Sequence, residues 1–236
     1  MLLIFTPKET DAMDCTLRKP MNDFTLRFIT ALCAVPLVVF IVHKGAPYFD
    51  LLAGIVGLGL LREWNRLVTL PKLHPGFLGG VAYIGSALAI LIFFSHKSDM
   101  HKLFLLWLLV TVWATDIGAY MVGKSLKGPK LSKRISPNKT WSGFLGGVAL
   151  ACLCSYLFNY FYPIDSLVSW PLMLITATLS VGAHGGDLLE SWVKRYFGVK
   201  DAGTLLPGHG GLLDRLDSLL FISILCGLFY WVGIIN

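Results

Sequence analysis

The chain has 236 residues, of which 55% are hydrophobic and only 14% are charged. Soluble domains carry about 25% charged residues, so this composition excludes an ordinary water-soluble globular domain. The apolar residues lie in long blocks and not in alternating patterns, which predicts an all-α, polytopic integral membrane protein.

Seven apolar blocks are candidates for membrane-spanning helices, because about 20 helical residues cross the hydrocarbon core of a bilayer. In chain order they are Phe24–Val42, Tyr48–Leu61, Gly76–Phe94, Leu103–Val122, Gly143–Tyr162, Trp170–Gly186 and Ser218–Ile235. The second block is short and predicts a tilted or shallow helix. Residues 1–20 are interpreted as a polar N-terminal leader, a candidate for disorder, and 21–236 as a single transmembrane catalytic domain.

The basic residues predict the orientation, because lysine and arginine favour cytoplasmic loops. If the N-terminus is cytoplasmic, all of the 20 basic residues except Lys44, Lys97 and Lys102 fall on the cytoplasmic side. We therefore expect an inner-membrane protein whose N-terminus and polar site face the cytoplasm. This bias and attraction to anionic lipid headgroups explain the net charge of +6, and no nucleic-acid partner is expected.

One segment of the chain matches a nucleotide-binding motif in its residue types but not in its predicted structural context. Gly118–Ser125 fits the P-loop pattern GxxxxGK[ST]. A P-loop needs a preceding strand and a following helix, so that backbone N–H groups can surround a phosphate. Here the motif closes a predicted membrane helix, and we interpret it as part of that helix.

Asp116 lies inside the fourth apolar block, where a carboxylate is costly and is by default a functional candidate. The alternative is a buried carboxylate with a structural partner. The basic loop that follows ends in Ser136–Trp141, where Lys139 and the hydroxyl groups of Ser136 and Thr140 are candidates for phosphate binding. An orientation signal alone would also explain a basic loop.

A denser polar cluster begins at the end of the sixth block. If that helix continues, Asp187, Glu190 and Lys194 share one face, because they are spaced by three and four residues. Two carboxylates followed by a cation can place a metal ion beside an anionic phosphate. The alternative is a solvated helix end with ion pairs worth only about 0.2–0.5 kcal/mol each.

The next segment repeats this chemistry. A glycine-rich turn, Leu206–Gly211, lets backbone N–H groups approach an anion, and Asp214 and Asp217 then lie three residues apart. Four carboxylates among basic side chains suit Mg²⁺ with a polyphosphate, because Mg²⁺ takes one or two carboxylates and completes its shell with water and phosphate. His209 in the turn is a candidate for contacting phosphate or handling a proton.

These segments together resemble the signature of the phosphatidate cytidylyltransferase (CDP-diacylglycerol synthase) family. The stretches that carry the resemblance are Ser191–Arg195 (SWVKR), Lys200–Gly211 (KDAGTLLPGHGG) and Leu212–Asp217 (LLDRLD), supported by Leu61–Trp64, Trp113–Tyr120 and Ser136–Trp141. The resemblance extends over most of the chain from about Met21.

The resemblance implies transfer of a cytidylyl group from CTP to phosphatidate, giving CDP-diacylglycerol and pyrophosphate for phospholipid biosynthesis. It implies Mg²⁺, with a second cation left open, held by Asp187, Glu190, Asp214 and Asp217. The implied catalytic residues are Asp187, Asp214, Lys194, Lys200 and His209. The implied substrate-binding residues are Asp116, Ser136, Asn138, Lys139, Thr140, Arg195, Asp201, Gly210, Gly211 and Arg215. A homodimer is expected by analogy only.

Two other classes of protein stay open. Another CTP-dependent membrane lipid enzyme, such as a polyprenol kinase or an archaeal-lipid cytidylyltransferase, needs the same kind of site, and its choice of lipid would discriminate. A transporter is the more remote alternative, and it predicts polar residues along a path through the membrane. Here the polar residues concentrate at the cytoplasmic ends of the apolar blocks.

Overall fold

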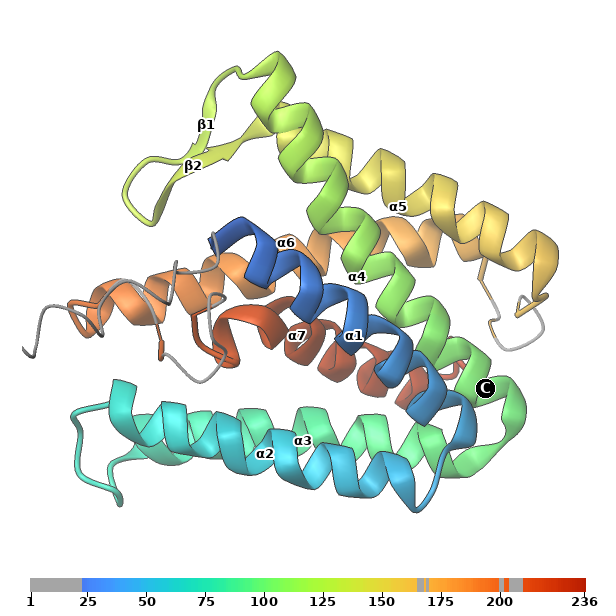
Figure 1. Cartoon of the computed structure of the whole chain (residues 1–236), viewed down its shortest axis with the longest axis horizontal. Coiled ribbons are helices and arrows are strands. Elements are labelled where there is room, and N and C mark those ends of the chain that lie inside the picture. The colour runs from blue at the N-terminus through green and yellow to red at the C-terminus, as the bar shows by residue number, and fades with distance from the viewer. Residues whose placement is uncertain (1–22, 165–167, 169, 200–201, 204–209) are drawn as a thin grey trace, which may run out of the picture.

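The computed structural model describes residues 23–164, 168, 170–199, 202–203 and 210–236. In this part of the chain the elements are α1 (Asp23–Lys44), α2 (Tyr48–Leu67), α3 (Pro75–Lys97), α4 (Asp99–Leu126), β1 (Lys130–Ser132), β2 (Ser136–Thr140), α5 (Trp141–Phe161), α6 (Leu172–Tyr196) and α7 (Leu213–Trp231) (Figure 1). Each predicted apolar block overlaps one of these helices. The helical membrane-protein class is therefore confirmed.

Four helices of the described residues are long and apolar enough to cross a bilayer. They are α3, α4, α5 and α6, with 23, 28, 21 and 25 residues. The last turns of α2 and the first turn of α7 carry charged residues that lower their apolar character. The count of seven spans therefore stays a prediction.

A small β-hairpin between α4 and α5 is an addition to the predicted all-helical architecture. β1 pairs antiparallel with β2, with Lys130 opposite Thr140 and Ser132 opposite Ser136. Thr140 then caps α5, because its Oγ1 accepts the Gly143 N–H at 3.1 Å. The hairpin thereby holds the predicted phosphate-binding loop at the start of a helix.

The P-loop-like segment Gly118–Ser125 lies wholly inside α4, as predicted. Its first glycine serves helix packing, because a Cβ at Gly118 would lie 2.6 Å from the carbonyl oxygen of Gly146 on α5. Similarly, a Cβ at Gly143 would lie 2.7 Å from the carbonyl oxygen of Ala119. Small residues at these positions let α4 and α5 pack backbone to backbone.

Buried hydroxyl groups connect α4, α5 and α6 in the middle of the bundle. The Trp107 indole N–H donates to Ser155 Oγ at 2.6 Å, and Ser155 shares a hydrogen bond of 2.8 Å with Thr176. Thr115 and Ser180 form a similar pair at 2.8 Å. All five side chains are 0% exposed, so they join helices instead of lining an open path. This arrangement argues against the transporter alternative.

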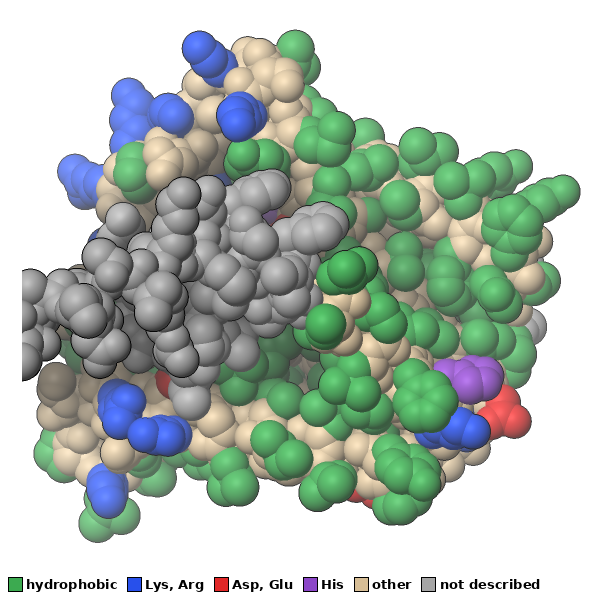
Figure 2. Space-filling view, viewed as in Figure 1, with side chains coloured by type: hydrophobic (Ala, Val, Ile, Leu, Met, Phe, Trp, Pro, Cys, Tyr) green, Lys and Arg blue, Asp and Glu red, His purple; other side chains and the backbone are tan. Residues whose placement is uncertain are grey.

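Exposed basic side chains gather at one end of the molecule in two groups, one over the hairpin and the turn before it and the other over the end of α2 and the turn to α3 (Figure 2). Four of them, Lys127, Lys130, Lys133 and Arg134, define what we refer to as the basic end. Hydrophobic side chains cover much of the remaining face in this view. The predicted orientation requires such an asymmetry, although the side of the membrane stays a prediction.

Candidate active site

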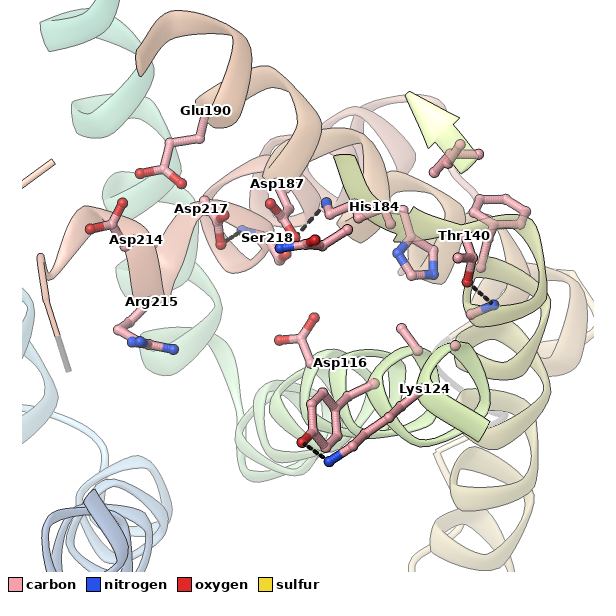
Figure 3. Close-up of a pocket in the computed structure, with 18 of the residues that line it drawn as sticks. Asp116, Lys124, Thr140, His184, Asp187, Glu190, Asp214, Arg215, Asp217 and Ser218 are labelled. Atoms are coloured by element: carbon pink, nitrogen blue, oxygen red, sulfur yellow. Dashed lines mark hydrogen bonds and ion pairs between the residues drawn. The ribbon is translucent and has the colours of Figure 1, made fainter. Parts of the chain in front are cut away.

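A cavity of about 600 Å³ opens at the basic end, among α4, the hairpin, α5, α6 and α7 (Figure 3). The residues predicted from the sequence that line it are Asp116, Asn138, Lys139, Thr140, Asp187, Glu190, Lys194, Asp214, Arg215 and Asp217. They come from α4, β2, α6 and α7. Folding thus brings together side chains from four elements that lie far apart in the sequence.

Lys194 on α6 joins two carboxylates of the cavity wall. Its Nζ lies 3.2 Å from Glu190 Oε2 and 2.6 Å from Asp214 Oδ1. The Lys194, Glu190 and Asp214 side chains are only 12%, 7% and 13% exposed. Glu190 and Lys194 share a face of α6 as their spacing predicts. Because Lys194 also bridges to α7, the cluster is more than a solvated helix end with local ion pairs.

Close packing of α6 on α7 makes this bridge possible. A Cβ at Gly186 would lie 2.6 Å from the Phe221 Cβ and 2.9 Å from the carbonyl oxygen of Asp217. A larger residue at this position would push the two helices apart. Gly186 therefore lets the carboxylates that follow it on α6 approach those of α7.

The Asp214 carboxylate is held from several directions. Besides Lys194, the backbone N–H groups of Ala202 and Gly211 donate to its Oδ2 at 3.1 and 3.0 Å. Burial raises the pKa of this carboxyl, but the hydrogen bonds from Lys194 and Ala202 act in the opposite direction, and the pKa lies below its ordinary value. Asp214 is therefore an anion at neutral pH.

A second ion pair joins the hairpin to α6. Lys139 Nζ lies 2.5 Å from Asp187 Oδ2, and Ser191 Oγ donates to Asp187 Oδ1 at 3.4 Å. The Lys139 and Asp187 side chains are 20% and 34% exposed, and both line the cavity. The basic loop is therefore more than an orientation signal, because its lysine reaches the carboxylate cluster.

Asp217 and Asp116 complete the acidic part of the cavity. Asp217 is 9% exposed, and its Oδ1 accepts the Ser218 N–H at 2.6 Å. Asp116 projects from α4 into the cavity, on the wall opposite Asp187 and Asp217 (Figure 3). The Asp116 side chain is exposed to the cavity, so its predicted role in substrate binding stays a prediction.

Some predicted site residues lie elsewhere. Neither Ser136 nor Arg195 is among the described residues that line the cavity, and the Arg195 guanidinium donates to the Val199 carbonyl oxygen at 3.2 Å. Gly210 and Gly211 precede α7, and Gly210 has a φ of +85° that favours glycine. The remaining predicted residues, Lys200, Asp201 and His209, lie outside the described residues.

The cavity also contains residues that were not singled out as site residues from the sequence. Tyr120 and Lys124 line it and share a hydrogen bond of 3.0 Å. They follow Asp116 by four and eight residues on α4, so the helical period could have revealed them. His184 also lines the cavity and precedes Asp187 by three residues, which is the same signal.

The oxygen donors of the cavity fit a hard divalent cation. Glu190 Oε1 is buried and has no hydrogen-bond partner, which leaves one carboxylate oxygen available. Among the described residues, no three His, Cys, Asp or Glu side chains form a ready-made metal group. Mg²⁺ needs only one or two carboxylates when water and phosphates complete its shell. The residues therefore fit an ion that binds together with a polyphosphate.

Comparison with known proteins identifies relatives over most of the chain. The phosphatidate cytidylyltransferases of Brucella suis biovar 1 (strain 1330) and Rickettsia felis are 33% and 35% identical, over 89% of this chain and 94% and 96% of those proteins. The phosphatidate cytidylyltransferase of Staphylococcus haemolyticus is 43% identical over 61% of this chain and 54% of that protein. Residues 72–232, which include every cavity residue named above, match the profile of the cytidylyltransferase family. The chain therefore belongs to the cytidylyltransferase family.

Proposed function

We propose that this protein transfers a cytidylyl group from CTP to phosphatidate, giving CDP-diacylglycerol and pyrophosphate. The observation that carries the proposal is the cavity in which Lys139 pairs with Asp187 and Lys194 pairs with Asp214. Its volume of about 600 Å³ lies within the usual range for small-ligand sites. Relatives that share most of the length carry the same activity in their names.

In the proposed reaction, a phosphate oxygen of phosphatidate attacks the α-phosphorus of CTP. A new P–O bond forms, the bond from the α-phosphorus to the oxygen bridging to the β-phosphorus breaks, and pyrophosphate leaves with the electron pair. The nucleophile is already an anion at neutral pH, so no strong general base is required. The protein has to hold two anions together in line.

Basic side chains of the cavity would counter the charge of the substrates. We assign Lys139, Lys194 and Arg215 to this role, because they line the cavity and cationic groups form strong hydrogen bonds with phosphate oxygens. We also propose that Lys200 and His209 contact phosphate groups of the substrates, as predicted from the sequence.

We propose that Mg²⁺ binds to four carboxylates of the cavity, those of Asp187, Glu190, Asp214 and Asp217. The proposal allows a second cation to bind to the same group of carboxylates. An ion held there would supply positive charge to offset the negative charge of the triphosphate and of the pyrophosphate product. Lys194 and the Ala202 and Gly211 N–H groups orient Asp214 for this role.

The proposal includes the membrane setting. The cavity would face the cytoplasm from the inner membrane, because lysine and arginine favour the cytoplasmic side and gather at the basic end. Phosphatidate would then reach the site from the surrounding bilayer. A homodimer and the lack of a nucleic-acid partner stay predictions from the sequence.

The test is pyrophosphate release by the purified protein in mixed micelles, with CTP and Mg²⁺, with and without phosphatidate. We expect release that needs both substrates and stops when EDTA is added. Asp50→Asn is a matched control, because Asp50 pairs with His96 at 2.8 Å and lies in the first turn of α2 outside the cavity.

Other outcomes would point elsewhere. Pyrophosphate release with an archaeal-type lipid phosphate but not with phosphatidate would favour the archaeal-lipid alternative. CDP release with a polyprenol would indicate a kinase. No CTP turnover by folded protein with any of these lipids would contradict the enzyme proposal.

A further inference from the structure

Glu63 is a buried carboxylate outside the cavity lining. It lies in the last turns of α2, and only 1% of its surface is exposed. Burying an ionisable side chain is costly unless hydrogen bonds or opposite charges compensate. The partners of Glu63 therefore indicate what it does.

Both carboxylate oxygens of Glu63 accept hydrogen bonds from the start of α7. The Leu212 N–H donates to Oε1 at 2.9 Å, and the Leu213 N–H donates to Oε2 at 2.8 Å. α7 has no capping side chain of its own, although the first N–H groups of a helix need acceptors. Glu63 supplies them from another helix and places negative charge at the positive end of the helix dipole.

The backbone before α7 approaches this carboxylate closely. A Cβ at Gly203 would lie 2.5 Å from Glu63 Oε1, and a Cβ at Gly211 would lie 3.0 Å from Glu63 Oε2. Side chains at these two positions would therefore crowd the carboxylate. Glycine at both positions allows the backbone to approach Glu63.

The backbone segments that lie against Glu63 also donate hydrogen bonds to Asp214. The Gly211 and Ala202 N–H groups donate to the Asp214 carboxylate at 3.0 and 3.1 Å. Gly211 precedes Leu212, whose N–H donates to Glu63, and Ala202 precedes Gly203, where a Cβ would collide with the Glu63 carboxylate. A displacement of Glu63 would therefore also displace the N–H groups that orient Asp214.

We propose that Glu63 is a positioning residue, which holds the start of α7 so that the Asp214 carboxylate presents its oxygens to the cation. The inference rests on the proposed function, in which Asp214 holds Mg²⁺. Glu63 acts through the backbone of Gly211–Leu213 and contacts no substrate. In this way α2, which contributes no residue to the cavity lining, takes part in cation binding.

The first measurement is Mn²⁺ binding to the purified protein in detergent, with CTP present and phosphatidate absent, by electron paramagnetic resonance of the free ion. Glu63→Gln keeps the shape of the side chain, but its NH₂ group faces a backbone donor. The Mn²⁺ dissociation constant should rise about tenfold or more, because losing a group that orients a metal ligand typically costs about 10–100-fold. Asp50→Asn on the same helix should leave the Mn²⁺ dissociation constant unchanged.

Two further variants separate positioning from general destabilisation. In an Asp214→Asn background, Glu63→Gln should cause no further loss of Mn²⁺ affinity, because its effect passes through Asp214. Gly203→Ala keeps Glu63 but crowds its Oε1, so it should weaken Mn²⁺ binding in the same direction. If Glu63→Gln does not fold, the Mn²⁺ affinity of Gly203→Ala tests the inference in its place.

Wild-type Mn²⁺ affinity in folded Glu63→Gln would overturn the inference, and so would additive losses in the Asp214→Asn background. Mn²⁺ binding does not require turnover. A wild-type protein that binds Mn²⁺ but releases no pyrophosphate would therefore contradict the proposed cytidylyl transfer, but not the cation binding by Asp214 on which the inference rests. A wild-type protein that binds no Mn²⁺ would overturn the inference directly.

Discussion

The middle of the bundle and the basic end use the same helices in opposite ways. In the middle, the buried polar groups of α4 and α6 are neutral and hydrogen-bonded, as in the Thr115–Ser180 pair. At the basic end, α6 carries buried charges, and Glu190 Oε1 has no hydrogen-bond partner. The middle of the bundle satisfies its own polar groups, whereas the basic end leaves a buried carboxylate oxygen without a hydrogen-bond partner. The neutral hydrogen bonds between helices and the charged groups proposed to bind ligands therefore lie at different levels of α6.

Asp187→Asn at the basic end should have the largest effect. It removes a proposed cation ligand and the charge that pairs with Lys139, so kcat/KM for CTP should fall about 100- to 1000-fold, as when one electrostatic stabiliser of a transition state is removed. Pyrophosphate release in mixed micelles measures the loss. Asp99→Asn is the control, because Asp99 is exposed and pairs with Lys102 away from the cavity. Near-wild-type turnover of Asp187→Asn would exclude Asp187 from the proposed site.

Lys194→Met should lower the free energy of unfolding, which tests how the charge cluster at the basic end contributes to stability. The change leaves Glu190 and Asp214 largely buried without their shared cation, and breaking such a cluster costs about 3 kcal/mol. Denaturant unfolding in detergent measures the loss. Added Mg²⁺ should stabilise the variant more than the wild-type protein, because the carboxylates then lack the lysine. An unchanged unfolding midpoint would show that the charge cluster contributes no net stability.

Ser155→Ala in the middle of the bundle should have the smallest effect. The Trp107 N–H and the Thr176 hydroxyl lose a shared partner, which should reduce the free energy of unfolding by about 1 kcal/mol. Activity per folded molecule should stay at the wild-type level, with Cys154→Ala at the neighbouring position as the control. A selective loss of turnover without a loss of stability would break the proposed separation of the two regions.

The helices were predictable because an apolar stretch of about 20 residues has few alternatives in a bilayer. Their bounds were less predictable, since α2 runs to Leu67 and α6 runs to Tyr196, through charged turns that lie beyond the apolar blocks. The hairpin Lys130–Thr140 was missed because strands of three and five polar residues show no clear hydrophobic period.

In the cavity, geometry within one helix was predictable, but contacts between elements were not. Spacing alone placed Glu190 and Lys194 on one face of α6. The pair between Lys139 and Asp187 depends on the hairpin, whose fold the local pattern does not reveal. The contacts of Glu63 could not be predicted from the sequence, because its partners are backbone N–H groups 149 and 150 residues later in the chain.

The two lysine–carboxylate contacts also bear on how ligands enter the cavity. Lys139 and Lys194 already neutralise carboxylates that are proposed to hold Mg²⁺. A triphosphate would draw these lysines towards its own oxygens, and a divalent ion would replace them at the carboxylates. Each ligand would thereby remove an obstacle to the other. We expect CTP and Mg²⁺ to enter by counter-ion exchange, so that each raises the affinity of the protein for the other.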